Sequence, residues 1–160
     1  MIRTLGAMVD ASERAQQLVG TLETRLAEVR SRAARLPKRP RVFFEEWDDP
    51  LISGIGWVSE LIEIAGGDDV FAELRTQQAA KNRIVSPEAV IAAAPDVILA
   101  SWCGKKVALD RIRQRPGWSD IPAVRNDRIV EIKSSLILQP GPASLTDGLD
   151  AIVKALGPHV

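Results

Sequence analysis

The sequence predicts an α/β protein in which one long N-terminal helix precedes a single lobe of alternating strands and helices. Apolar residues recur at helical spacing through the first 36 positions. From residue 41 onward, short apolar runs alternate with helical segments, and Pro and Gly mark the boundaries between them. With 160 residues, 46% of them hydrophobic, the chain can bury one substantial core.

The segment 3–36 is expected to form one long helix. Its apolar positions follow each other at intervals of three and four, as one helical face requires; they are Leu18, Leu22, Leu26, Val29, Ala33 and Leu36. At about 1.5 Å per residue the helix would be roughly 50 Å long, which exceeds the width of a small lobe. Pro37 and Pro40 end it, so the predicted units are 1–37 and 41–160. A coiled-coil dimerisation arm is the alternative use of such a helix.

Strands of the lobe are expected at 42–47, 97–102 and 128–132, where apolar runs are bounded by turn residues. Strands that alternate with helices favour a mainly parallel sheet.

Helices are expected at 57–65, 87–94, 107–115 and 144–156. The clearest start signal is Ser86-Pro87-Glu88, which supplies an N-cap, a proline at the first helical position and an acid in the first turn. Gly66-Gly67 and Gly157-Pro158 close the first and last of these helices.

The carboxyl ends of the predicted strands carry the residues of greatest functional interest, because ligands of open α/β sheets bind outside these ends. The first strand ends in four carboxylates around Trp47, namely Glu45, Glu46, Asp48 and Asp49. Such a cluster would repel itself in a packed core, so it is expected to face water, a ligand or a partner. Trp47 and Trp102 are expected to line an exposed mouth, whereas Trp118 is expected to pack structurally.

Composition argues against several classes of protein. Lys+Arg and Asp+Glu both number 21, which gives no sign of a nucleic-acid surface or a polybasic membrane patch. The single cysteine, Cys103, excludes an internal disulfide and is expected to be buried. The single histidine, His159, makes a transition-metal site a poor interpretation. No apolar run reaches the roughly 20 residues of a membrane span, and the first residues lack a secretion signal.

The run 45–67 resembles the C-terminal lobe of cobalamin-type substrate-binding proteins of ABC importers. Further matches are Ser86-Pro87-Glu88, Ala94-Pro95-Asp96-Val97-Ile98, Pro116-Gly117-Trp118 and Gln139-Pro140-Gly141-Pro142. The resemblance covers essentially the whole chain and implies an α/β sandwich lobe. The opening helix is similar to the rigid backbone helix that joins two lobes in this class.

This resemblance implies a non-catalytic module that binds vitamin B12 or a related corrinoid between two lobes and delivers it to a membrane permease. The corrinoid is then a transported ligand, and neither a cofactor nor a metal site is expected. It also implies that the N-terminal lobe lies outside this chain, and that the intact protein works in the periplasm or cell envelope. By position, the ligand contacts are Glu46, Trp47, Arg83, Trp102, Leu136 and Gln139. Glu88 corresponds to a lobe-tip glutamate that pairs with an arginine of the permease.

The sequence is compatible with other kinds of protein. An iron-siderophore or haem carrier would share the fold, although Tyr, a frequent ligand group in such carriers, is absent. A non-catalytic interaction domain could dimerise through the long helix, and Leu5, Met8 and Val9 are expected to drive self-association of the chain. An enzyme using the paired carboxylates is disfavoured, because adjacent strand residues point to opposite faces.

Overall fold

The N-terminal segment of the computed structural model, which describes residues 1–157, is a helical hairpin rather than one helix. Helix α1 (Ile2–Met8) turns back on helix α2 (Ser12–Ala33), and Asp10 takes a left-handed conformation (φ 54°) in the turn. A β-carbon on Gly6 would lie 2.3 Å from Cβ of Ala15, so the close approach of the two helices depends on this glycine. The prediction of a single helix over 3–36 was therefore wrong. The chain reverses between Met8 and Ser12, and Gly6 lets the two helices pack closely.

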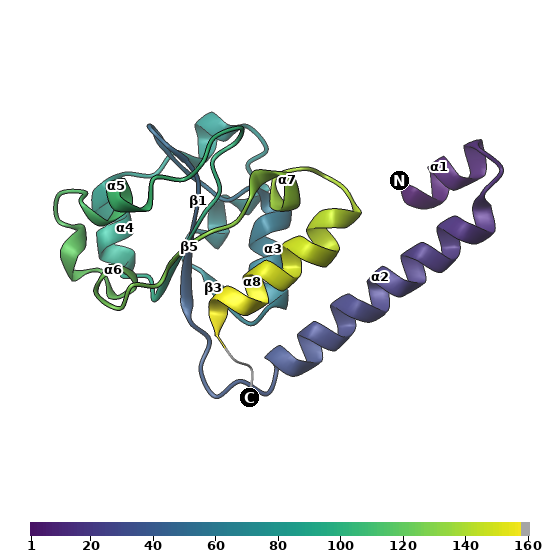
Figure 1. Ribbon diagram of the computed structural model, residues 1–160, viewed down its shortest axis with the longest axis horizontal. Helices are drawn as coiled ribbons and strands as arrows, with labels where there is room; N and C mark the ends of the chain where they lie inside the picture. Colours follow the sequence, from purple (N-terminus) through teal and green to yellow (C-terminus); the bar gives the residue numbers. More distant parts are fainter. Residues whose placement is uncertain (158–160) are drawn as a thin grey trace.

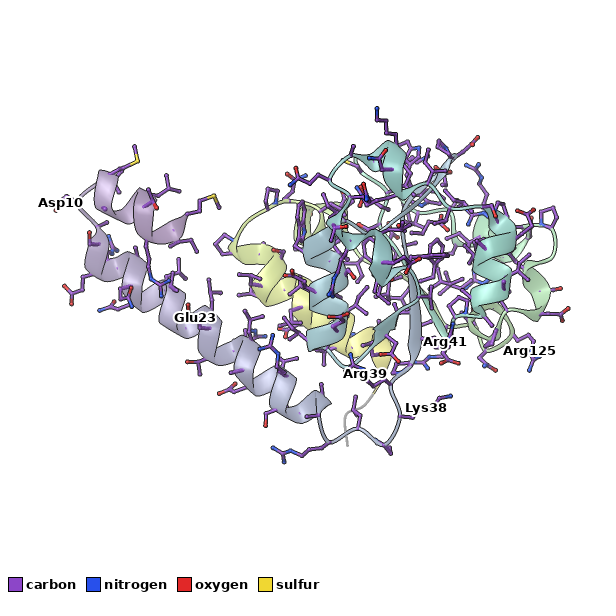
Figure 2. All side chains as sticks on the ribbon, turned by 180° about the vertical axis from the view of Figure 1, so that it is seen from behind. Asp10, Glu23, Lys38, Arg39, Arg41 and Arg125 are labelled. Atoms are coloured by element: carbon purple, nitrogen blue, oxygen red, sulfur yellow. The ribbon has the colours of Figure 1, made fainter. Side chains whose placement is uncertain are left out.

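Helix α1 runs away from the lobe, and the longer α2 runs back beside it to the lobe (Figure 1). Leu5, Met8 and Val9 are exposed, as the self-association hypothesis requires, and association itself stays a prediction. Asp10 lies at the far tip of the hairpin, whereas Arg39 lies where the linker enters the lobe (Figure 2). Arg39 fixes this linker by donating to the carbonyl of Gly67 at 2.6 Å and by an ion pair of 3.0 Å with Asp68.

The lobe is built on a mixed, mainly parallel sheet with the order β2-β1-β4-β5. Strand β1 (Arg41–Asp48) pairs in parallel with β4 (Val97–Ala100), which pairs in parallel with β5 (Ile129–Glu131). On its other edge, β1 pairs with the short parallel β3 (Asp68–Asp69) at its start and with the antiparallel β2 (Leu51–Ser53) at its end. The three predicted strands are confirmed; β2 and β3 were not predicted.

Helices cover both faces of the sheet (Figure 1). One core packs α2, α3 (Gly56–Ile64) and α8 (Leu149–Leu156) against Val42, Phe44 and Leu99. The other core packs α4 (Pro87–Ala93) and α5 (Leu109–Arg113) against Phe43 and Ile98. The alternation of Phe43 and Phe44 between the two cores follows from the period of two in a strand. It also places Glu45 on the same face as Phe43.

The predicted helix boundaries are mostly close to those observed. Ser86 caps α4 as expected, since its hydroxyl accepts a hydrogen bond of 3.1 Å from the N–H of Ala89. The closing helix, predicted over 144–156, begins with a π-helical turn, Ser144–Gly148, before α8. Short elements went unpredicted: the helices α6 (Pro122–Arg125) and α7 (Ser134–Ile137) and the 3₁₀ turns Ala72–Thr76, Ala80–Arg83 and Trp118–Asp120.

None of the helices within residues 1–157 is both long and apolar enough to cross a membrane. His159, on which the transition-metal alternative depended, lies outside the described residues.

Candidate functional site

The candidate site lies where β1, β4 and β5 end at their carboxyl termini, together with the loops that follow them. The strands are in register here, since Glu45 pairs with Ala100 and Ala100 pairs with Glu131. The acidic end of β1, Trp102 and the 132–142 segment therefore belong to one edge of the sheet.

Glu45 is fully buried and paired within the lobe. Its carboxylate accepts hydrogen bonds from both terminal nitrogens of Arg115, at 2.5 and 2.9 Å, and from the indole N–H of Trp102 at 3.0 Å. The Arg115 guanidinium in turn lies 4.5 Å from the ring centroid of buried Trp118. This network anchors the loops after β4 and α5 to the end of β1.

Glu46 forms a second ion pair, with Arg83, at an irregularity of the β1–β2 ladder between Glu45 and Trp47. Two terminal nitrogens of Arg83 donate to the two carboxylate oxygens of Glu46 at 2.7 and 2.9 Å. The Glu46 carboxylate also accepts the N–H of Ile55 at 2.9 Å, and Arg83 donates to the carbonyl of Ser53. Arg83 is only 1% exposed, and these contacts tie the segment Ala80–Arg83 to β1 and β2.

Asp48, the third carboxylate, is buried and forms ion pairs with two cations. Lys105 contacts its Oδ1 at 2.8 Å, and Arg111 contacts its Oδ2 at 3.1 Å. Burial is the largest single influence and raises the pKa of Asp48, but the hydrogen bond and charge of Lys105, with the charge of Arg111, together hold the pKa below its ordinary value. Asp48 is therefore ionised at neutral pH.

These pairings overturn two sequence-based expectations. Of the four carboxylates expected to face water, a ligand or a partner, only Asp49 is exposed, because cations distant in sequence neutralise Glu45, Glu46 and Asp48 inside the lobe. Trp102, expected at an exposed mouth, is 2% exposed.

The structure also shows the environments of Trp47, Trp118 and Cys103. Trp47 is half-buried and donates its indole N–H to the carbonyl of Asp49 at 3.0 Å. Trp118 packs in the core as predicted. Cys103 is exposed rather than buried, because it lies in the loop after β4.

The late part of the site, after β5, contains Leu136 on α7 and Gln139 in the following loop, half-buried and exposed respectively. Trp57, at the start of α3, was also expected near this edge of the sheet, and it donates its indole N–H to the carbonyl of Ile137 at 3.0 Å. It also lines an apolar cavity of about 420 Å³ between the N-terminal hairpin and this loop, together with Ile2, Val19, Pro140 and Leu145.

Glu88 lies apart from the paired carboxylates, in the first turn of α4, and is exposed. It lines a groove of about 550 Å³ with Asp49 and Pro50 from the turn between β1 and β2.

Among residues 1–157, no cluster of His, Cys, Asp or Glu side chains is arranged to hold a metal ion. The accessible groups of the site are the Trp47 ring, the Gln139 amide and the partly exposed cations Lys105 and Arg111.

Comparison with known proteins identifies a matching family and several relatives. A model of the periplasmic binding protein family matches residues 1–136. The chain is 25% identical to a Bacillus subtilis protein described as an uncharacterised ABC transporter substrate-binding lipoprotein, YvrC, over 98% of this chain and 49% of that protein. It is 31% identical to a vitamin B12-binding protein of Vibrio parahaemolyticus over 68% of this chain and 38% of that protein. The chain thus spans about half, or less, of these relatives.

Solved structures show the same fold. The apo form of the periplasmic haem-binding protein RhuT from Roseiflexus sp. RS-1 is 28% identical, with a TM-score of 0.75 over 97% of this chain and 61% of that chain. A protein of an Fe³⁺-hydroxamate transport system from Saccharomonospora viridis is 27% identical, with a TM-score of 0.79 over 98% of this chain and 54% of that chain.

Proposed function

The chain belongs to the periplasmic binding protein family, and we propose that it forms the C-terminal lobe and interlobe helical segment of an ABC importer's substrate-binding protein. Proteins of this family bind and deliver substrates without transforming them, and they carry no resident cofactor. In this proposal residues 41–160 hold one side of the ligand and residues 1–37 connect to a second lobe. The intact protein would work in the periplasm or cell envelope.

The observation that carries this proposal is the carboxyl edge of the sheet. Its buried and half-buried acids are neutralised by cations of the same lobe, and accessible side chains remain at the strand ends and in the loops that follow: Trp47, Leu136 and Gln139, which we call the rim. An aromatic surface with few hydrogen-bonding groups suits a large, flat macrocycle with amide arms. We therefore propose cobalamin or a related corrinoid as the ligand.

A haem or iron-siderophore ligand is the second candidate, and specific residues favour it. Lys105 and Arg111 lie beside the same edge with side chains 40% and 65% exposed. Either could pair with a carboxylate or another anionic group of a ligand. The haem-binding and hydroxamate-transport neighbours support this candidate about as well as the vitamin B12-binding relative supports the first.

We assign different roles to the predicted ligand residues. Trp47, Leu136 and Gln139 are proposed to contact the ligand, because each is at least partly accessible. The buried Trp102 and the Glu46–Arg83 pair, also predicted as ligand contacts, are proposed to hold this rim in position.

Glu88 is proposed to contact the permease. It is exposed and shares its groove with Asp49, so a cationic side chain of a partner would meet two carboxylates there. Docking charges act mainly on association and its salt dependence. The position of Glu88 in the first turn of α4 also stabilises this helix by about 0.3–1 kcal/mol.

A reconstituted importer tests this function. The full-length protein with its ligand should stimulate ATP hydrolysis by the importer, and Glu88→Gln should raise the carrier concentration needed by about tenfold at low salt, since a docking charge is lost. Ligand affinity should not change. Glu60→Gln, an exposed acid on α3, is the matched control and should behave as the wild type. Equal stimulation by both variants across a salt series would remove Glu88 from the interface, and no stimulation by the wild type would contradict the carrier function.

A further inference from the structure

The side chain of Lys105 is held between two indole rings. Its ammonium nitrogen lies 4.2 Å from the ring centroid of Trp47 and 4.8 Å from that of Trp102. The same nitrogen contacts Oδ1 of Asp48 at 2.8 Å. A cation that has aromatic faces on two sides and a carboxylate as its ion-pair partner is in the environment by which proteins recognise organic ammonium groups.

Trp47, Trp102 and Asp48, which we call the walls of this environment, are held in place by contacts that do not involve Lys105. Trp102 is fixed by its hydrogen bond to Glu45, and Trp47 by its hydrogen bond to the carbonyl of Asp49. Asp48 keeps a second cation, because Arg111 contacts its other oxygen, Oδ2. Removing the Lys105 ammonium would therefore leave two anchored rings and one free carboxylate oxygen.

Lys105 itself is less firmly fixed than the walls. Its side chain is 40% exposed, and it lies in the loop after β4, beside Gly104 in a left-handed conformation (φ 74°) and exposed Cys103. The loop lies at the carboxyl edge of the sheet, where an incoming molecule could reach the ammonium group. The lysine can thus be displaced without disturbing the buried Glu45–Arg115 pair.

We propose that Trp47, Trp102 and Asp48 form a binding site for an organic ammonium group, in which Lys105 is the resident occupant. A ligand that carries a primary or quaternary ammonium binds there by displacing the lysine side chain. Because an attached side chain competes at a high effective concentration, a free cation binds the wild type weakly. This site goes beyond the proposed carrier function and does not depend on which metal chelate is carried.

Titration with tetramethylammonium tests the proposal. Lys105→Met removes the charge while keeping the length of the side chain, and it should bind tetramethylammonium at least tenfold more tightly than the wild type by calorimetry and tryptophan fluorescence. Adding Asp48→Asn or Trp47→Leu to this variant should abolish the gain. Lys106→Met, which changes the neighbouring lysine, should behave as the wild type.

A neutral molecule of the same shape, neopentyl alcohol, separates recognition of the cation from apolar binding and should not compete. A second measurement uses the wild-type protein and therefore does not depend on whether a variant folds. The ε-methylene protons of Lys105 should show an upfield ring-current shift that moves toward the free-lysine value as tetramethylammonium is added. The proposal is overturned if Lys105→Met gains no affinity, if the neutral molecule binds equally well, or if saturating cation leaves the Lys105 signal unmoved.

Discussion

Replacement of Glu45 by alanine should lower the free energy of unfolding by about 3–5 kcal/mol, because it leaves the Arg115 guanidinium, whose side chain is only 16% exposed, without its partner. The Arg115 guanidinium would lose both hydrogen bonds to the carboxylate, and the buried indole N–H of Trp102 would lose its acceptor. Urea denaturation followed by far-UV circular dichroism measures the change.

Two further variants give this prediction its control. Asp110→Ala breaks an exposed ion pair with Arg113 and should cost at most about 1 kcal/mol. The double variant Glu45→Leu/Arg115→Met removes both charges and should be more stable than Glu45→Ala, because no buried charge is left unpaired. If Glu45→Ala were as mild as Asp110→Ala, the pair would not anchor the rim.

Arg83→Met should lower the free energy of unfolding by about 3 kcal/mol or more, since the Glu46 carboxylate would keep only the Ile55 N–H as a partner. The 3₁₀ turn Ala80–Arg83 would also lose its tie to Ser53. Thermal and urea unfolding are the measurements. Arg75→Met is the matched control, because it breaks a more exposed ion pair with Glu63.

A double variant of the Glu46–Arg83 pair shows whether these two residues support the rim or contact the ligand. Glu46→Gln/Arg83→Met should recover part of the lost stability, because both charges are removed together. If the pair only holds the rim, ligand affinity of this double variant in the full-length protein should stay within about threefold of the wild type. A loss of a hundredfold or more, with stability recovered, would instead make Glu46 or Arg83 a ligand contact.

Local signals were sufficient to predict much of the fold. Ser86, Pro87 and Glu88 identify the start of α4 because an N-cap, a proline and an acid each satisfy a local requirement of a helix start. The runs around Phe44 and Leu99 identify buried strands because they are continuous and apolar. The hairpin of α1 and α2 was missed because apolar spacing continues through its turn, and only the packing of Gly6 on Ala15 distinguishes the two arrangements.

The candidate site was less predictable because its pairings join distant parts of the chain. The acidic run appeared incompatible with burial, and nothing local to Glu45 or Asp48 shows that Arg115 and Lys105 will neutralise them. The carboxyl-edge rule did place Trp47 and Trp102 in the same region, although Trp102 turned out to be covered. Which aromatic rings are accessible depends on the loop after β4, whose conformation is set by these long-range contacts.

Calorimetric titration of the full-length protein with cyanocobalamin, haem and a ferric hydroxamate siderophore tests the central claim most directly. One of the three should bind with a dissociation constant near or below micromolar, which corresponds to about −8 kcal/mol. Trp47→Ala should weaken that binding by at least tenfold, because the aromatic surface at the carboxyl edge is lost. Absence of binding by all three, or binding that Trp47→Ala and Leu136→Ala both leave unchanged, would contradict the assignment of this edge as the ligand-binding face.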